Sequence, residues 1–198
     1  MIAPFTFNTT PSIRFGEGLL DEIGPMLAAD DHQTALIVTD AGMMATGIVD
    51  RALSSLAASG ITTGLYTDVE ADPPEAVVHA AVDAARAAGA GMIIGIGGGS
   101  SLDVAKLVAL LLPGHQTLAA AYGVGNAVGP RLPLLLVPTT AGTGSEVTPI
   151  SIITTGKSEK MGVVSPVILA DIALLDPSLT LSVPPHITAA TGIDAMVH

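Results

Sequence analysis

The segment at 90–112, AGMIIGIGGGSSLDVAKLVALLL, constrains the fold more than any other part of the chain. A short aliphatic run ends in three consecutive glycines, and an apolar helical stretch follows at once. A fully apolar strand, a glycine turn and a helix in this order are typical of a parallel sheet with crossover helices. We therefore expect an α/β protein.

The same alternation of strands and helices extends along most of the chain. Aliphatic runs bounded by turn residues predict strands, and amphipathic stretches that stop at glycines predict helices. This order favours a parallel α/β sheet with flanking helices. The predicted strands are at 34–40, 61–69, 92–96, just before Pro138, at 150–154 and within 167–177; the predicted helices are at 19–29, 48–59, 75–88 and from the glycine turn to about 112; 155–160 is predicted as a polar loop.

The last residues, SVPPHITAATGIDAMVH at 182–198, differ in character from the rest. Two prolines break the chain, and a predicted helix then continues to the last residue. We expect one α/β domain at 1–181 and the truncated beginning of a helical domain at 182–198.

Composition excludes several functional classes. The net charge is -11 with only seven Lys and Arg, which argues against a nucleic-acid or anionic membrane partner. The chain has no cysteine, and therefore no disulfide or cysteine-based zinc site. Its start lacks the pattern of a signal peptide, and its apolar runs are too short to span a bilayer. We expect a cytoplasmic protein.

GGGSS at 97–101 is the strongest candidate for ligand binding. Gly97, Gly98 and Gly99 carry no Cβ, so a phosphate can approach the backbone closely. The helix that follows adds free N–H groups and the positive end of its dipole, and Ser100 or Ser101 can donate to a phosphate oxygen. A pyrophosphate is the natural ligand; the alternative is a tight turn that binds nothing.

Two further strand ends carry polar side chains. Asp40 ends its strand, where its carboxylate could accept from an adenosine ribose and favour NAD over NADP. From Asp40 alone, a role as a helix-capping acid is the simpler interpretation. Thr139 and Thr140, in PTTAGTGSE at 138–146, are placed to contact a ribose or phosphate, or form only a structural turn.

Asp194 and His198 are four positions apart on the last predicted helix, so both side chains lie on one face. A carboxylate and an imidazole suit Fe²⁺ or Zn²⁺, but two ligands do not make a catalytic metal site, and a surface pair is the simpler interpretation. Lys160 is either a cofactor contact or a surface lysine. Asp103 and Lys106 are expected to form a pair within one helix.

Three long motifs in this order resemble those of the iron-containing (group III) alcohol dehydrogenases. The matching segments are GGGSSLDVAK at 97–106, PTTAGTGSEVT at 138–148 and TAATGIDAMVH at 188–198, with IRFGEG at 13–18 and LIVTD at 36–40 in addition. The resemblance implies a Rossmann-like dinucleotide-binding domain at 1–181 followed by an all-helical domain, in a dehydroquinate-synthase-like architecture. A metal would lie in the cleft between the two domains.

The resemblance also implies roles for individual residues. The 97–101 turn would bind the pyrophosphate and Asp40 the adenosine ribose, while Asp194 and His198 would be the first two of four metal ligands. The other two ligands are histidines of the helical domain, which this sequence lacks. Asp72 stands where the family often has Asn. Further cofactor contacts are expected from Thr139, Thr140, Thr148, Lys160 and Leu179.

The implied activity is hydride transfer between NAD(H) and a small alcohol, aldehyde or ketone, with Fe²⁺ or Zn²⁺ as a Lewis acid. The alternatives are a dehydroquinate-synthase-like enzyme, a glycerol- or maleylacetate-type dehydrogenase, and, for these 198 residues alone, a nucleotide-binding module without catalytic activity. A homodimer or larger homo-oligomer is expected from the family.

Overall fold

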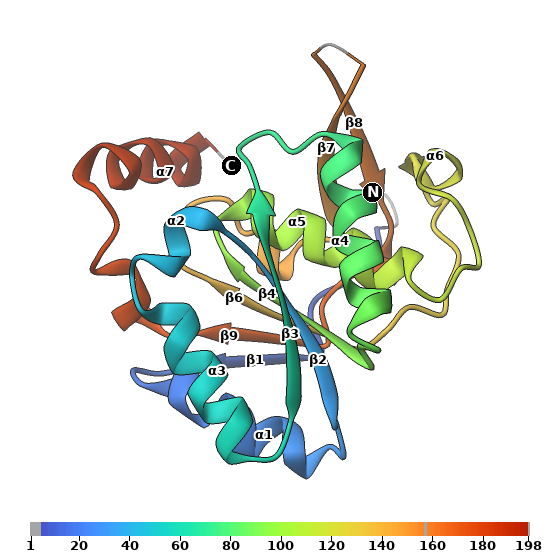
Figure 1. Ribbon diagram of the computed structural model, residues 1–198. Coiled ribbons are helices and arrows are strands. Elements are labelled where there is room, and N and C mark those ends of the chain that lie inside the picture. The colour runs from blue at the N-terminus through green and yellow to red at the C-terminus, as the bar shows by residue number, and fades with distance from the viewer. Residues whose placement is uncertain (1–4, 157, 198) are drawn as a thin grey trace.

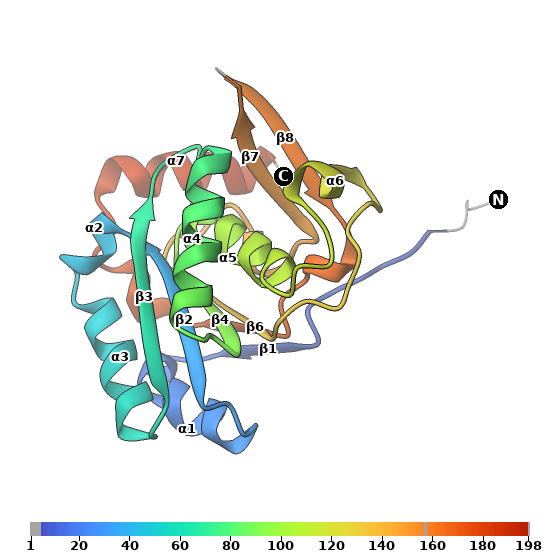
Figure 2. The same cartoon turned by 45° about the vertical axis from the view of Figure 1, so that its right-hand side comes forward.

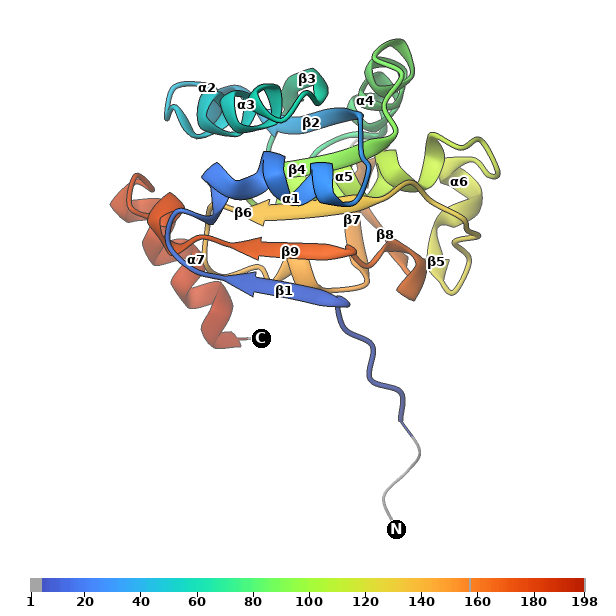
Figure 3. The ribbon, with the colours of Figure 1, turned by 90° about the horizontal axis from the view of Figure 1, so that it is seen from below.

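The computed structural model describes residues 5–156 and 158–197 (Figure 1). Its centre is a six-stranded sheet in which all neighbouring strands are parallel. The strands are β1 (Ser12–Phe15), β2 (Thr34–Asp40), β3 (Thr62–Val69), β4 (Met92–Gly97), β6 (Leu134–Pro138) and β9 (Ile172–Leu175). They lie in the order β1-β9-β6-β4-β2-β3, which Figure 3 shows from below. The predicted α/β fold is therefore confirmed.

Helices cover both faces of this sheet. The helix α1 (Ile23–Ala29), the 3-10 turn η1 (Leu19–Glu22) and α3 (Ile48–Ala58) pack on one face, and α4 (Glu75–Ala87) and α5 (Gly99–Leu111) pack on the other. Successive side chains of a strand point to opposite faces, so each strand contributes to both cores. In β2, for example, Leu36 and Val38 face α4 and α5, while Ile37 faces α1 and α3.

A smaller sheet stands beside the main one. It consists of β5 (Gly123–Val124), β8 (Glu159–Val164) and β7 (Ile150–Thr155), and the antiparallel β7–β8 hairpin projects from the body of the protein (Figure 2). The remaining elements are α2 (Ala41–Met44), α6 (Leu118–Ala121), η2 (Ser145–Val147), η3 (Pro166–Ile168), η4 (Pro177–Thr180) and α7 (Pro185–Val197).

The polar loop predicted at 155–160 is wrong at both ends, because Thr155 belongs to β7 and Glu159 and Lys160 belong to β8. Only Val163 of β8 is buried, so the strand shows no apolar periodicity. Pairing with β7, from Ile150↔Val164 to Thr155↔Glu159, gives this segment its conformation. A partner strand, rather than the local sequence, makes it a strand.

The predicted C-terminal helix forms as α7, and none of its described residues is buried. Its contact with the rest of the chain is close at Gly142, where a Cβ would collide with the backbone of Thr191. The predicted domain boundary near residue 182 stays a prediction. Across the described residues, every helix is too short or too polar to cross a membrane.

Gly95, in the middle of β4, lets helix α5 approach the sheet. A Cβ there would lie 2.7 Å from Leu136 Cδ2 and 2.8 Å from Ala105 Cβ. Because Ala105 Cβ is fixed to the helix backbone, relief would require α5 itself to move.

We predict that Gly95→Ala lowers the free energy of unfolding by about 1–3 kcal/mol, the usual cost of overpacking a core. The matched control is Gly192→Ala in α7, where no atom lies within 4 Å of the added Cβ; it should be neutral or stabilise slightly. Urea denaturation of both variants measures this. An equal effect of the two substitutions would contradict the packing argument.

Arg131 and Asp171 form a two-pronged ion pair at the amino ends of β6 and β9, at 2.7 Å (Nη1–Oδ2) and 2.9 Å (Nη2–Oδ1). Arg131 Nε also donates to the Val167 carbonyl. Partial burial raises the pKa of Asp171, but hydrogen bonds from Arg131 and the Leu134 N–H lower it more, so the pKa lies below its ordinary value.

A carboxyl group with a lowered pKa stabilises the fold above its unfolded-state pKa, and this contribution is lost as the pH falls through the folded-state pKa. We therefore predict that the difference in Tm between the wild type and Asp171→Asn is constant from about pH 7 to about pH 5, and shrinks below about pH 4. Thermal unfolding across this range tests it. A difference unchanged down to about pH 2 would rule out the ion pair as its source.

Candidate functional site

The carboxyl ends of β2, β4 and β6 meet at one edge of the sheet, where parallel α/β proteins bind their ligands. Asp40 ends β2, Gly97 ends β4, and Thr139 follows β6. The Thr139 N–H donates to the Gly97 carbonyl at 2.9 Å, which fixes the two glycine-containing turns to each other. A pocket of about 660 Å³ opens above them.

Of the three glycines in the turn, only Gly98 has room for a Cβ without a close contact. Gly97 has φ +144°, and a Cβ there would lie 2.8 Å from Ser101 Oγ; at Gly99 it would lie 3.0 Å from Thr143 Cγ2. At Gly98 it would meet nothing closer than 3.6 Å, at Thr140 Oγ1. A substituent on Gly98 would therefore project into the pocket between the turn and Thr140.

Helix α5 begins at the floor of this pocket. Its N-cap residue is Gly98, which has no side chain to accept from the first helical N–H groups. Free N–H donors and the positive end of the helix dipole together attract anions. The room at Gly98, which lines the pocket, and these donors fit a phosphate group.

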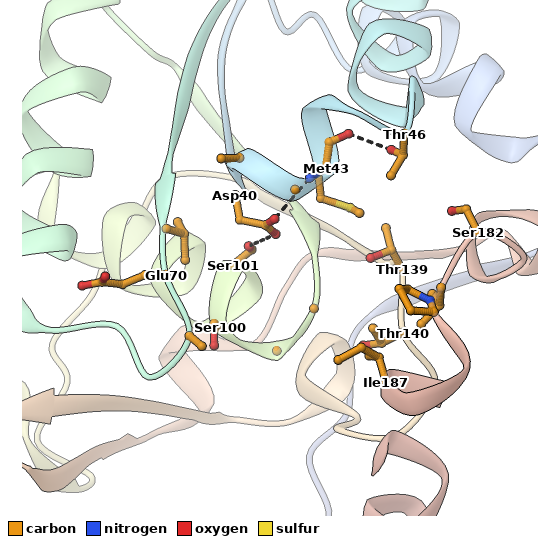
Figure 4. Close-up of a pocket in the computed structure, with 18 residues that line it drawn as sticks. Asp40, Met43, Thr46, Glu70, Ser100, Ser101, Thr139, Thr140, Ser182 and Ile187 are labelled. Atoms are coloured by element: carbon orange, nitrogen blue, oxygen red, sulfur yellow. Dashed lines mark hydrogen bonds between the residues drawn. The ribbon is translucent and has the colours of Figure 1, made fainter. Parts of the chain in front are cut away.

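Asp40 caps a helix, as the simpler interpretation of the sequence expected, and its contact with a ribose stays a prediction. Its Oδ1 accepts from the Met43 N–H at 3.1 Å and caps α2, while its Oδ2 accepts from Ser101 Oγ at 3.3 Å (Figure 4). It also lines the pocket. The carboxylate is thus held in place by the start of α2 on one side and the start of α5 on the other.

A second pocket, of about 770 Å³, adjoins the first and shares Gly99 and Ser100 with it. Thr148, Lys160 and Asp194 line it. Most of the residues predicted from the sequence therefore line one of two neighbouring pockets. They are Asp40, Gly98, Ser101, Thr139 and Thr140 in the first, Thr148, Lys160 and Asp194 in the second, and Gly99 and Ser100 in both.

Two predicted residues lie outside these linings. Gly97 is buried beneath the first pocket and shapes the turn. Leu179, in η4, is 1% exposed, and its side chain belongs to the core on the α1 and α3 side of the sheet. A contact of Leu179 with a cofactor stays a prediction.

The described residues do not complete a metal site. Asp194 lies half-buried in the wall of the second pocket, and His198, its predicted partner, lies outside the described residues. Within 5–156 and 158–197, no three His, Asp or Glu side chains are grouped so as to hold a metal ion.

The charge of the two pockets is mostly negative. In the described part of the chain, Lys160 is the basic residue of the two linings. Its Nζ lies 2.5 Å from Asp72 Oδ1 and 3.0 Å from Thr154 Oγ1, which in turn donates to the Asp72 carbonyl at 2.9 Å. The pair joins the turn after β3 to the β7–β8 hairpin. The acidic residues that line the pockets are Asp40, Glu70, Asp72, Asp103 and Asp194.

Sequence reasoning missed several residues of the linings. Glu70 follows β3 at the same sheet edge, so its position after a predicted strand could have identified it. Ser182 and Ile187 approach from the α7 region, and Ile150 and Ile152 from the hairpin. No local pattern marks these four, because tertiary packing brings them to the site.

Comparison with known proteins gives a consistent result. The sequence pattern described as iron-containing alcohol dehydrogenase matches residues 10–177. Long-chain-alcohol dehydrogenase 1 of Geobacillus thermodenitrificans is 42% identical over 194 residues, which are 95% of this chain and 48% of that protein. The chain spans about half the length of the curated relatives it matches.

Solved structures show the same relation. A 1,3-propanediol oxidoreductase superposes with a TM-score of 0.93 at 30% identity, covering 98% of this chain and 51% of that one. A sulfoacetaldehyde reductase from Bifidobacterium kashiwanohense, solved in complex with NAD⁺, superposes with a TM-score of 0.88 at 34% identity, covering 97% and 51%. The glycine turn and its pocket thus lie within a fold shared over nearly the whole chain.

We predict that Asp72→Asn tightens the binding of NAD by up to about fivefold, because an exposed ion pair is worth at most about 1 kcal/mol and its loss frees Lys160 to donate to the dinucleotide. Asn also tolerates the positive φ of 54° found at this position. Calorimetric titration at low ionic strength measures the change. The matched control is Asp83→Asn, which breaks the exposed Asp83–Arg86 pair on α4 and should leave the binding of NAD unchanged. If Asp72→Asn alone weakens the binding of NAD, Asp72 itself contacts the ligand.

Proposed function

Because the chain belongs to the iron-containing alcohol dehydrogenase family, we propose that it is the NAD(H)-binding part of an oxidoreductase that interconverts an alcohol and an aldehyde or ketone. The observation that carries the proposal is the N-terminus of α5 at Gly98, which lines the first pocket between the ends of β4 and β6 and has room for a Cβ. The first pocket would hold the adenosine half and the pyrophosphate of the dinucleotide.

Different groups of the chain would bind different parts of the dinucleotide. The first N–H groups of α5 would donate to the pyrophosphate, which needs no basic side chain there. Asp40, fixed by Met43 and Ser101, would accept from the adenosine ribose hydroxyls. A 2′-phosphate would instead meet this carboxylate, with Glu70 in the same lining, so NAD is favoured over NADP by charge.

The second pocket would hold the nicotinamide half, since the two pockets meet at Gly99 and Ser100. When bound, the nicotinamide supplies the hydride acceptor or donor. Thr148 and Lys160 line this pocket and would orient the ribose and the ring. Ile150 and Ile152 of β7 would form its apolar wall.

A divalent metal, Fe²⁺ or Zn²⁺, is part of the proposal for the whole protein, with Asp194 as one ligand. We derive no catalytic step through it, because the described residues do not complete its site. Residues 1–198 alone are expected to bind dinucleotide without turning over alcohol. Four expectations from the sequence remain. They are a small alcohol or aldehyde substrate, a homodimer or larger assembly, a helical domain from residue 182 and a cytoplasmic location.

We predict that Asp40→Asn reduces the preference for NAD over NADP by about tenfold or more, because Asn keeps the helix cap but removes the charge that repels a 2′-phosphate. Titration calorimetry with both cofactors measures the ratio of the two Kd values. The matched variant is Gly98→Ala, which the fold accommodates but which fills the phosphate position; it should weaken both cofactors alike. If the wild-type chain binds neither cofactor, the proposed function of this chain is wrong.

A further inference from the structure

Lys106 is completely buried, although it carries a charge and lines neither pocket. Its ammonium donates to Asp103 Oδ1 at 3.3 Å, to Ser145 Oγ at 2.9 Å and to the Ile150 carbonyl at 2.6 Å. Three acceptors match the three donors of an ammonium group. Burial lowers the pKa of Lys106, and the neighbouring Asp103 carboxylate opposes that shift.

Asp103 is held from several sides as well. Its Oδ1 accepts from Ser145 Oγ at 2.5 Å, and its Oδ2 accepts from the Ile152 N–H at 2.9 Å. Its backbone carbonyl accepts from Ser151 Oγ at 3.0 Å. The pair expected within one helix is therefore also a junction between elements that are about 40 residues apart in the sequence.

The junction joins three walls of the second pocket. Asp103 and Lys106 belong to α5, which contributes Gly99 and Ser100 to the lining. Ser145 starts η2, in the loop that contributes Thr143 and Thr148. The remaining partners belong to β7, whose Ile150 and Ile152 complete the apolar side.

Stability alone does not account for this arrangement. Desolvating an ammonium and a carboxylate costs several kcal/mol per ion, and well-packed apolar residues often hold a core at least as well. Directional hydrogen bonds, in contrast, fix one relative position of the elements they join. Here the hydrogen bonds fix the position of the Gly/Thr loop at 139–148 relative to helix α5.

We propose that Lys106, Asp103 and Ser145 are positioning residues that hold the loop at 139–148 against α5 and so set the shape of the pocket for the nicotinamide half of the dinucleotide. The identity of that ligand rests on the proposed function. The first pocket, which the junction does not touch, takes the adenosine half. Loss of the junction should therefore weaken the binding of the whole dinucleotide but not the binding of its ADP portion.

The test compares NAD with ADP as titrants, using Ser145→Ala as the variant. The substitution removes one small hydroxyl and leaves Lys106 with two acceptors, so the chain should fold. We expect the Kd for NAD to rise about tenfold or more, which corresponds to about 1.4 kcal/mol, while the Kd for ADP changes less than about twofold. Ser145→Thr, which keeps a hydroxyl, should restore the binding of NAD.

The control is Asp171→Asn, which breaks the more exposed Arg131–Asp171 ion pair at the opposite ends of the strands. It should lower the Tm but leave both Kd values unchanged. Equal weakening of NAD and ADP by Ser145→Ala, or weakening of NAD by Asp171→Asn, would overturn the proposal.

Hydrogen exchange separates this inference from the proposed function. If the junction positions the loop, amides at 142–148 lose protection in Ser145→Ala but not in Asp171→Asn. This holds even if the wild type binds neither ligand, a result that would overturn the proposed function only. Unchanged protection at 142–148 in Ser145→Ala would overturn the positioning role.

Discussion

The packing of helix α5 on the sheet is the interaction on which the rest of the structure depends. Ten of its thirteen residues are buried, and Gly95 lets it approach β4 closely. Because α5 starts two residues after β4 ends, its first N–H groups lie at the carboxyl edge of the sheet. The first pocket lies between this helix start and the ends of β2 and β6. The second lies along its other side, where β7 and the Gly/Thr loop are joined to it.

The distribution of charge decides which ligands fit these pockets. The chain is acidic, and so are the pocket linings, yet the N-terminus of α5 at Gly98 favours an anion. The conflict is resolved because the anion would meet backbone N–H groups rather than carboxylates. Lys160 is paired with Asp72, and Lys106 donates its hydrogen bonds to buried groups inside the protein. Any additional phosphate on the ligand would therefore meet carboxylates.

Local sequence predicted the main strands and helices well, because aliphatic runs bounded by glycines carry their own signal. The predicted strand at 34–40 coincides with β2, and the helix predicted to stop before Gly60 ends at Ala58. Strand β8 was missed because it is mostly exposed and depends on β7. The same limit applies to Lys106, for which the sequence indicated a simple pair within one helix and the structure shows a junction of three elements.

The sequence by itself determined the parallel α/β class, the glycine turn and ten of the residues that line the two pockets. It could do so because phosphate-sized openings and helix starts depend on residues that are adjacent in the chain. Only the tertiary structure decided that Asp40 caps α2 while facing the first pocket, that Lys160 is paired with Asp72, and that Leu179 belongs to the core. These outcomes depend on distances between residues far apart in sequence, which packing sets and local pattern does not encode.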